Sequence, residues 1–232
     1  MTGIASQHVV VVPADAAMLH GQLTMPACPG AVVLVVDEAG EHAIARHVAG
    51  SLNQRGVATL LTDALTADER MHARMAAESR SNVQLIARRL VAQTDWLAVC
   101  GNLQNLPIGY FAASDAAAAA LGAAADRQGS VSAIVAYDAR PLLAAAALPC
   151  VRAPTLFITH ANNHALLKVN RAGFERLLCP KRFELLVENP PDVEHIGGLV
   201  SDRLRWPRRS AWPPTPSRAG NVASDQSATP SC

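Results

Sequence analysis

The sequence predicts an α/β domain with a mostly parallel central sheet and helices on both faces of that sheet. Short runs of β-branched residues alternate with longer amphipathic segments, which is the pattern of a parallel sheet built from strand–helix units. One run, at residues 31–36, is apolar throughout, as expected of a strand buried on both faces. The chain has 232 residues, of which 50% are hydrophobic and 17% charged, so it can form one sizeable core.

The predicted elements follow in a regular order. The first two strands, at residues 9–12 and 19–25, are expected to pair antiparallel through a short turn. Further strands are predicted at residues 31–36, 57–61, 107–112, 131–137, 155–159 and 182–187. Helices are predicted at residues 42–55, 82–98, 115–125 and 165–178, with a short one after His195. In the helix at 82–98 the apolar residues share one face, and Arg88 and Arg89 are expected to point outward.

The composition changes near residue 206. Prolines and serines become frequent there, and prolines cannot continue a helix. We therefore predict one domain over residues 1–205 and a flexible tail over residues 206–232. Two tryptophans, Trp206 and Trp212, leave open that part of the tail packs against the domain.

Charge and cysteine content narrow the function classes. The formal net charge is only +1, which gives no field for attracting nucleic acid or an acidic membrane surface. Residues 1–7 do not resemble a signal peptide, no apolar run is long enough to span a membrane, and the five cysteines have no metal-type spacing. We expect a cytoplasmic protein that acts on or binds small molecules, with no metal and no cofactor. The oligomeric state is unknown.

The segment around Ser114 carries the clearest chemical signal. An apolar strand runs into Ser114 and then into an alanine-rich helix, and the residues two before and two after the serine are Ala112 and Ala116. A nucleophile elbow requires this arrangement, because larger side chains at these positions would collide at the sharp strand-to-helix turn. The alternative is that Ser114 caps the helix, since serine is a preferred N-cap residue.

The sequence also resembles the dienelactone-hydrolase-like branch of the α/β-hydrolases. The resemblance extends over about residues 14–195 and rests on the order and spacing of six segments: LHGQL (19–23), LNQRGVATLL (52–61), LTADER (65–70), TDWL (94–97), LPIGYFAAS (106–114) and VRAPTL (151–156). It implies the α/β-hydrolase fold, a Ser–acid–His triad in that chain order, and hydrolysis of ester or lactone bonds in small molecules without a cofactor.

Two members of the family's triad, the nucleophile and the base, have a match in this chain, whereas the acid does not. Ser114 matches the nucleophile, and His195, after the loop at residues 188–194, matches the base; a surface loop histidine is the alternative reading of His195. Asn163 stands where the family has its acid, and losing the carboxylate of a serine triad costs about 10⁴ in rate. Asp138 directly follows the neighbouring strand and is a candidate replacement that would orient His195, or else it caps the turn at residues 140–141.

The expected oxyanion hole is also altered. The turn after the third strand reads Asp37-Glu38-Ala39-Gly40, and the residue after the nucleophile is Asp115, so the backbone N–H groups of Glu38 and Asp115 would lie among carboxylates. Negative charge opposes the oxyanion of an esterase. Three hypotheses therefore stay open: a serine hydrolase with a degenerate catalytic triad, a catalytically inactive binding or regulatory homologue, and an acidic pocket for a cation. Residues 68–81 and 161–166 are interpreted as loops that set specificity.

Overall fold

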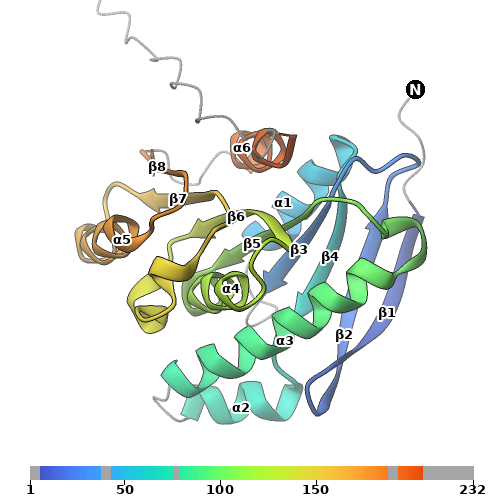
Figure 1. Ribbon diagram of the computed structural model, residues 1–232, viewed down its shortest axis with the longest axis horizontal. Helices are drawn as coiled ribbons and strands as arrows, with labels where there is room; N and C mark the ends of the chain where they lie inside the picture. Colours follow the sequence, from blue (N-terminus) through green and yellow to red (C-terminus); the bar gives the residue numbers. More distant parts are fainter. Residues whose placement is uncertain (1–5, 38–42, 76–78, 188–192, 206–232) are drawn as a thin grey trace, which may run out of the picture.

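Eight strands form one sheet in the order β1-β2-β4-β3-β5-β6-β7-β8 in a computed structural model of the chain, which describes residues 6–37, 43–75, 79–187 and 193–205 (Figure 1). The strands are β1 (Ser6–Ala14), β2 (Ala17–Met25), β3 (Val32–Asp37), β4 (Ala58–Asp63), β5 (Ile108–Ala113), β6 (Val131–Tyr137), β7 (Thr155–His160) and β8 (Lys181–Leu186). The helices are α1 (Ala43–Gln54), α2 (Ala67–Met75), α3 (Ser79–Val99), α4 (Ser114–Asp126), α5 (His164–Arg176) and α6 (Val193–Arg205).

The strand directions confirm the predicted sheet. β1 pairs antiparallel with β2, and β2 pairs antiparallel with β4. All neighbours from β4 through β3 and β5 to β8 are parallel. The carboxyl ends of these parallel strands therefore lie along one edge of the sheet, where ligands bind in open α/β folds.

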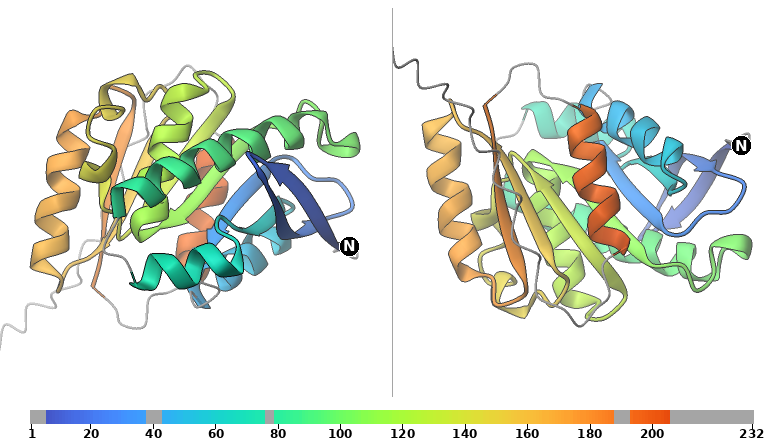
Figure 2. Two further views of the ribbon diagram at one scale, coloured as in Figure 1. Left: turned by 90° about the horizontal axis from the view of Figure 1, so that it is seen from below. Right: turned by 90° about the horizontal axis from the view of Figure 1, so that it is seen from above.

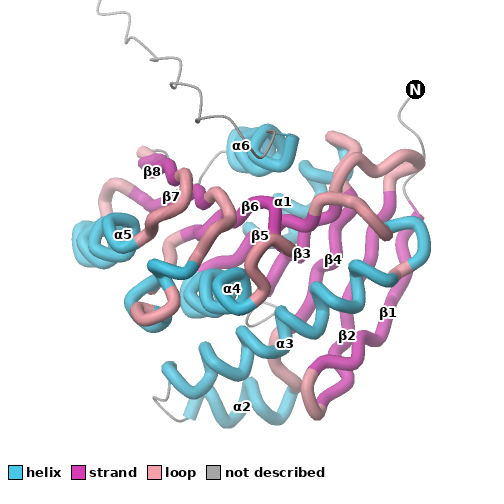
Figure 3. Tube along the Cα trace, viewed as in Figure 1, coloured by secondary structure: helices cyan, strands magenta, loops and turns pink. Residues whose placement is uncertain are grey.

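Helices cover both faces of the sheet. Figure 2 shows α3 and α4 in front of the sheet in one view and α1 and α6 in front of it in the opposite view, and Figure 3 shows the strands between these two layers. The apolar strand β3 contributes to both cores, because Val33 and Val35 pack with α1 and α6 whereas Leu34 and Val36 pack with α3 and α4. None of the described helices is both long and apolar enough to cross a membrane.

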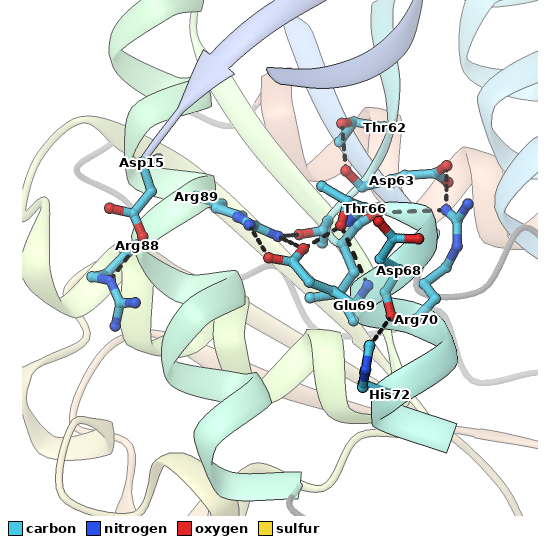
Figure 4. A network of polar contacts seen from close by, with 12 residues as sticks. Asp15, Thr62, Asp63, Thr66, Asp68, Glu69, Arg70, His72, Arg88 and Arg89 are labelled. Atoms are coloured by element: carbon cyan, nitrogen blue, oxygen red, sulfur yellow. Dashed lines mark hydrogen bonds and ion pairs between the residues drawn. The ribbon is translucent and has the colours of Figure 1, made fainter. Parts of the chain in front are cut away.

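Three local predictions were wrong. Residues 68–81 are not a loop, because α2 spans Ala67–Met75 and α3 begins at Ser79. The loop predicted at residues 161–166 ends at Asn163, because α5 begins at His164. A reciprocal capping pair begins α2: the Thr66 N–H donates to Glu69 Oε2 at 2.8 Å, and the Glu69 N–H donates to Thr66 Oγ1 at 3.4 Å. Arg89 does not point outward either. Its side chain is 3% exposed and donates to both carboxylate oxygens of Glu69 at 2.6 Å (Figure 4).

The end of the domain differs from the prediction as well. His195 lies inside α6, which begins at Val193, so the helix starts before this residue and not after it. The predicted tail at residues 206–232, with Trp206 and Trp212, lies outside the described residues, and so does Glu38.

Candidate active site

Ser114 occupies a sharp turn between β5 and α4. Its φ angle is 51°, in the left-handed region that L-residues other than glycine avoid. The preceding residue, Ala113, is extended and is the N-cap of α4, with no side-chain capping bond. Ser114 therefore does not act as the N-cap. Its strained backbone is the conformation that a nucleophile elbow requires.

Small residues surround this turn. Ala112 at the end of β5 and Ala116 in the first turn of α4 are both fully buried. Ala113 and Ala117 are buried beside them, so the turn lies between two packed layers. The structure therefore accommodates an elbow with alanine in place of glycine on both sides of Ser114. Within the described residues, the Ser114 hydroxyl forms no hydrogen bond to another group.

Asp115 follows the serine in the first turn of α4, where backbone N–H groups have no partner within the helix. Its carboxylate lies 3.4 Å from the Arg140 guanidinium, and the Asp115 side chain is only 15% exposed. Arg140 also donates its backbone N–H to the Ser114 carbonyl at 3.3 Å. The Asp115 carboxylate, one of those that sequence analysis placed near the oxyanion, therefore faces the guanidinium of a residue bonded to the same turn.

Asp138 follows β6 directly and contacts a histidine that the sequence analysis did not select. Its Oδ1 accepts the backbone N–H of His160 at 3.2 Å, and its Oδ2 lies 3.6 Å from His160 Nδ1. The other ring nitrogen of His160, Nε2, is 3.3 Å from the Tyr137 hydroxyl. Burial raises the pKa of the Asp138 carboxyl, against the opposing effect of the His160 N–H. Asp138 has a φ angle of 42° and does not cap the turn at Arg140.

Three other predicted site residues lie at the start of α5, near the start of α6 and at the end of β3. The Asn163 side chain is the N-cap of α5, where Oδ1 accepts the Leu166 N–H at 3.1 Å. His195 is exposed near the start of α6, which packs against β5 and β6. The Asp37 backbone ends β3, and Glu38 lies outside the described residues. Among the contacts of the described residues, none joins Ser114 to Asp138 or to Asn163. A cluster of three or more potential metal ligands is likewise absent from the described part of the chain.

No family model matches the sequence. Proteins from two strains of Mycobacterium tuberculosis, each proposed by name as a phosphoribosyl transferase, are 36% identical over 207 residues. The match covers 83% of this chain but 45% of theirs, so this chain spans about half the length of these curated relatives.

Solved structures gave matches over nearly their whole length. A dienelactone hydrolase from Anabaena variabilis is 34% identical, with a TM-score of 0.77; the match covers 85% of this chain and 96% of that chain. Est1E from Butyrivibrio proteoclasticus has a TM-score of 0.66 at 14% identity, over 84% of this chain and 96% of that one. An alpha-beta serine hydrolase homologue from Coxiella burnetii has a TM-score of 0.68 at 12% identity, over 85% and 97%. The last two are similar in fold alone.

Proposed function

The chain belongs to the dienelactone-hydrolase-like family of α/β-hydrolases, and we propose that it hydrolyses ester or lactone bonds of small molecules with Ser114 as the nucleophile. One observation carries the proposal: the left-handed backbone of Ser114 at the junction of β5 and α4. Strain of this kind costs about 1–3 kcal/mol and persists where the surrounding structure maintains it, which is most often at functional sites.

The proposed reaction uses the geometry of the turn. The Ser114 hydroxyl oxygen attacks the substrate carbonyl carbon while its proton passes to an imidazole. The Asp115 N–H, at the positive end of the α4 dipole, stabilises the oxyanion that forms. Arg140 offsets the Asp115 carboxylate, which would otherwise oppose this charge. Family order predicts His195 as the imidazole, with Asp138 or Asn163 as its partner.

A fluorophosphonate probe tests the proposal directly, because it reacts only with an activated serine. We expect the wild-type protein to be labelled at Ser114, as located by peptide mass spectrometry, and the Ser114→Ala variant to be unlabelled. Hydrolysis of p-nitrophenyl acetate and of a small aromatic lactone should be lost in the same variant. A wild-type protein that is folded by circular dichroism but unlabelled would contradict the proposal.

A second candidate function is a binding or regulatory protein that keeps the fold without hydrolysis. The Asn163 side chain favours this reading, because it is bound to the α5 backbone at the position where the family has a carboxylate. Under this function the Ser114→Ala variant would bind ligands as the wild type does, and neither protein would react with the probe. Labelling of Ser114 therefore separates the two functions.

A further inference from the structure

Three side chains meet at the carboxyl ends of β6 and β7. The rings of Tyr137 and His160 are edge-to-face, at 88° with centroids 5.7 Å apart, and the Tyr137 hydroxyl lies 3.3 Å from His160 Nε2. On the other side of the imidazole, Asp138 Oδ2 lies 3.6 Å from Nδ1. The His160 side chain is 16% exposed and that of Asp138 is 23% exposed, so the imidazole is enclosed between a phenol and a carboxylate.

These partners determine which imidazole nitrogen carries the proton. Burial raises the pKa of the Tyr137 hydroxyl, so at neutral pH this group is protonated and can donate to Nε2. Nδ1 is buried without a hydrogen bond, and a closure of a few tenths of an ångström would bring it within bonding distance of Asp138. The neutral imidazole therefore has its proton on Nδ1 and its lone pair on Nε2. A general base of the serine-hydrolase type has this tautomer.

The group lies beside the nucleophile turn. Ala113 of β5 pairs with Tyr137 of β6, and Tyr137 pairs with Ile158 of β7. His160 is two residues beyond Ile158, and a strand spacing of ~4.8 Å with a rise of ~3.3 Å per residue places the Cα atoms of Ser114 and His160 about 10 Å apart. A serine and a histidine side chain are together long enough to span most of that distance. The turn after Asp138 is also bonded to the nucleophile turn, through the Arg140 N–H and the Ser114 carbonyl.

The backbone of Asp138 indicates that its position is imposed by the surrounding structure. Its φ angle of 42° is unfavourable for an L-residue, although aspartate tolerates it better than most. Its own N–H is fixed by the Ile158 carbonyl at 2.8 Å, and its Oδ1 by the His160 N–H. The carboxylate is therefore held next to the imidazole by two backbone contacts from β7.

We propose that His160 is the general base for Ser114 and that Asp138 is the residue that positions it, in place of a pair built on His195. This inference rests on the proposed function. As the Ser114 oxygen bonds to the ester carbonyl carbon, the serine proton moves to Nε2, which exchanges its long contact with Tyr137 for one with Ser114. Nε2 then returns the proton to the leaving alkoxide as the ester C–O bond breaks. In the second half, water attacks the acyl-enzyme, giving its proton to Nε2, and Ser114 leaves with that proton as the acid is released.

The test compares second-order rates of fluorophosphonate labelling from pH 5 to pH 9. We expect His160→Gln to lower the rate at least a hundredfold, and His20→Gln, at an exposed histidine in β2, to change it less than threefold. Asp138→Asn should lower the rate at least tenfold and displace the acidic limb of the pH profile, and Asp138→Glu should restore part of the rate. A role in packing alone would leave that limb where it is. Circular dichroism and urea unfolding establish that each variant is folded.

Nitrogen NMR of the imidazoles provides a readout that does not depend on labelling. The wild type should show His160 protonated on Nδ1 at neutral pH, and Asp138→Asn should shift the population toward the Nε2 tautomer. Labelling of the wild type with an unchanged rate in His160→Gln, or a His160 proton on Nε2, would overturn this inference while leaving the proposed function intact. A folded wild type that is not labelled at all would overturn both.

Discussion

Ser114 and Asp138 have the same left-handed backbone conformation at the carboxyl ends of neighbouring strands, with φ angles of 51° and 42°. The turn that follows Asp138 donates a hydrogen bond to the Ser114 carbonyl through the backbone of Arg140. Two strained residues at one edge of the sheet are thus joined by the backbone. A strained conformation persists only when the surrounding structure enforces it. We therefore expect that some substitutions at this edge raise the stability of the protein while they lower its activity.

Replacement of Ser114 by glycine should leave a more stable protein than replacement by alanine. Alanine retains a β-carbon in the left-handed region, whereas glycine does not, and we expect a difference of about 1 kcal/mol in the free energy of unfolding in urea. Both variants should lose the probe reaction. The control is Ala118→Gly in the middle of α4, which should instead lose stability, because glycine is unfavourable inside a helix. An alanine variant at least as stable as the glycine variant would show that the turn is unstrained.

Glu69→Gln should destabilise the fold through Arg89. The Arg89 guanidinium is almost fully buried and would lose its carboxylate, and removing one partner of a buried pair costs about 3–5 kcal/mol. Because the Glu69 side chain is 35% exposed, we expect a smaller loss, of about 2 kcal/mol. Asp15→Asn is the matched control, since the pair of Asp15 with Arg88 on the surface should contribute less than about 1 kcal/mol. Equal effects of the two substitutions on urea unfolding would contradict the buried role of Arg89.

The same ion pair predicts a pH dependence of stability. The hydrogen bonds from Arg89, outweighing burial, lower the pKa of Glu69 from 4.5 to about 2. Because the folded pKa is depressed, the stabilisation is complete above the unfolded value and disappears as the pH falls from about 4.5 to about 2. The free energy of unfolding of the wild type should therefore fall more steeply across this window than that of Glu69→Gln. Parallel curves for the two proteins would show that Glu69 titrates normally.

Sequence patterns predicted the sheet and the sharp turn at Ser114 because both depend on local chemistry. Residues 31–36 are a continuous apolar run, and the turn needs only small residues around Ser114. The helix Ala67–Met75 was missed because it is polar around most of its circumference, although its capping pair is visible in the sequence as Thr66 and Glu69. The pairing of His160 with Asp138 depends on strand register, which the sequence does not reveal.

Asn163 should prove to be a structural cap whose loss affects stability more than catalysis. Its Oδ1 accepts the Leu166 N–H at the start of α5, and replacing such a cap by alanine typically costs about 1 kcal/mol. We expect Asn163→Ala to lose this amount in thermal unfolding with less than a threefold change in the rate of probe labelling. Asn163→Asp keeps a favourable cap and should remain as stable as the wild type. A tenfold or larger loss of labelling in Asn163→Ala would instead assign Asn163 to the catalytic group.

The packing of α6 on α1 depends on one glycine. A β-carbon at Gly197 would lie 2.2 Å from the Ser51 hydroxyl oxygen, which itself donates to Glu194 Oε2 at 2.9 Å. Gly197→Ala should therefore push the two helices apart and cost about 1–3 kcal/mol. The adjacent Gly198→Ala would meet only the end of the flexible Arg55 side chain, at 3.8 Å, and should gain up to about 1 kcal/mol from its helix propensity. In urea unfolding we therefore expect Gly197→Ala to lower the free energy of unfolding and Gly198→Ala to raise it. A Gly197→Ala protein as stable as the wild type would contradict the close contact of α1 and α6.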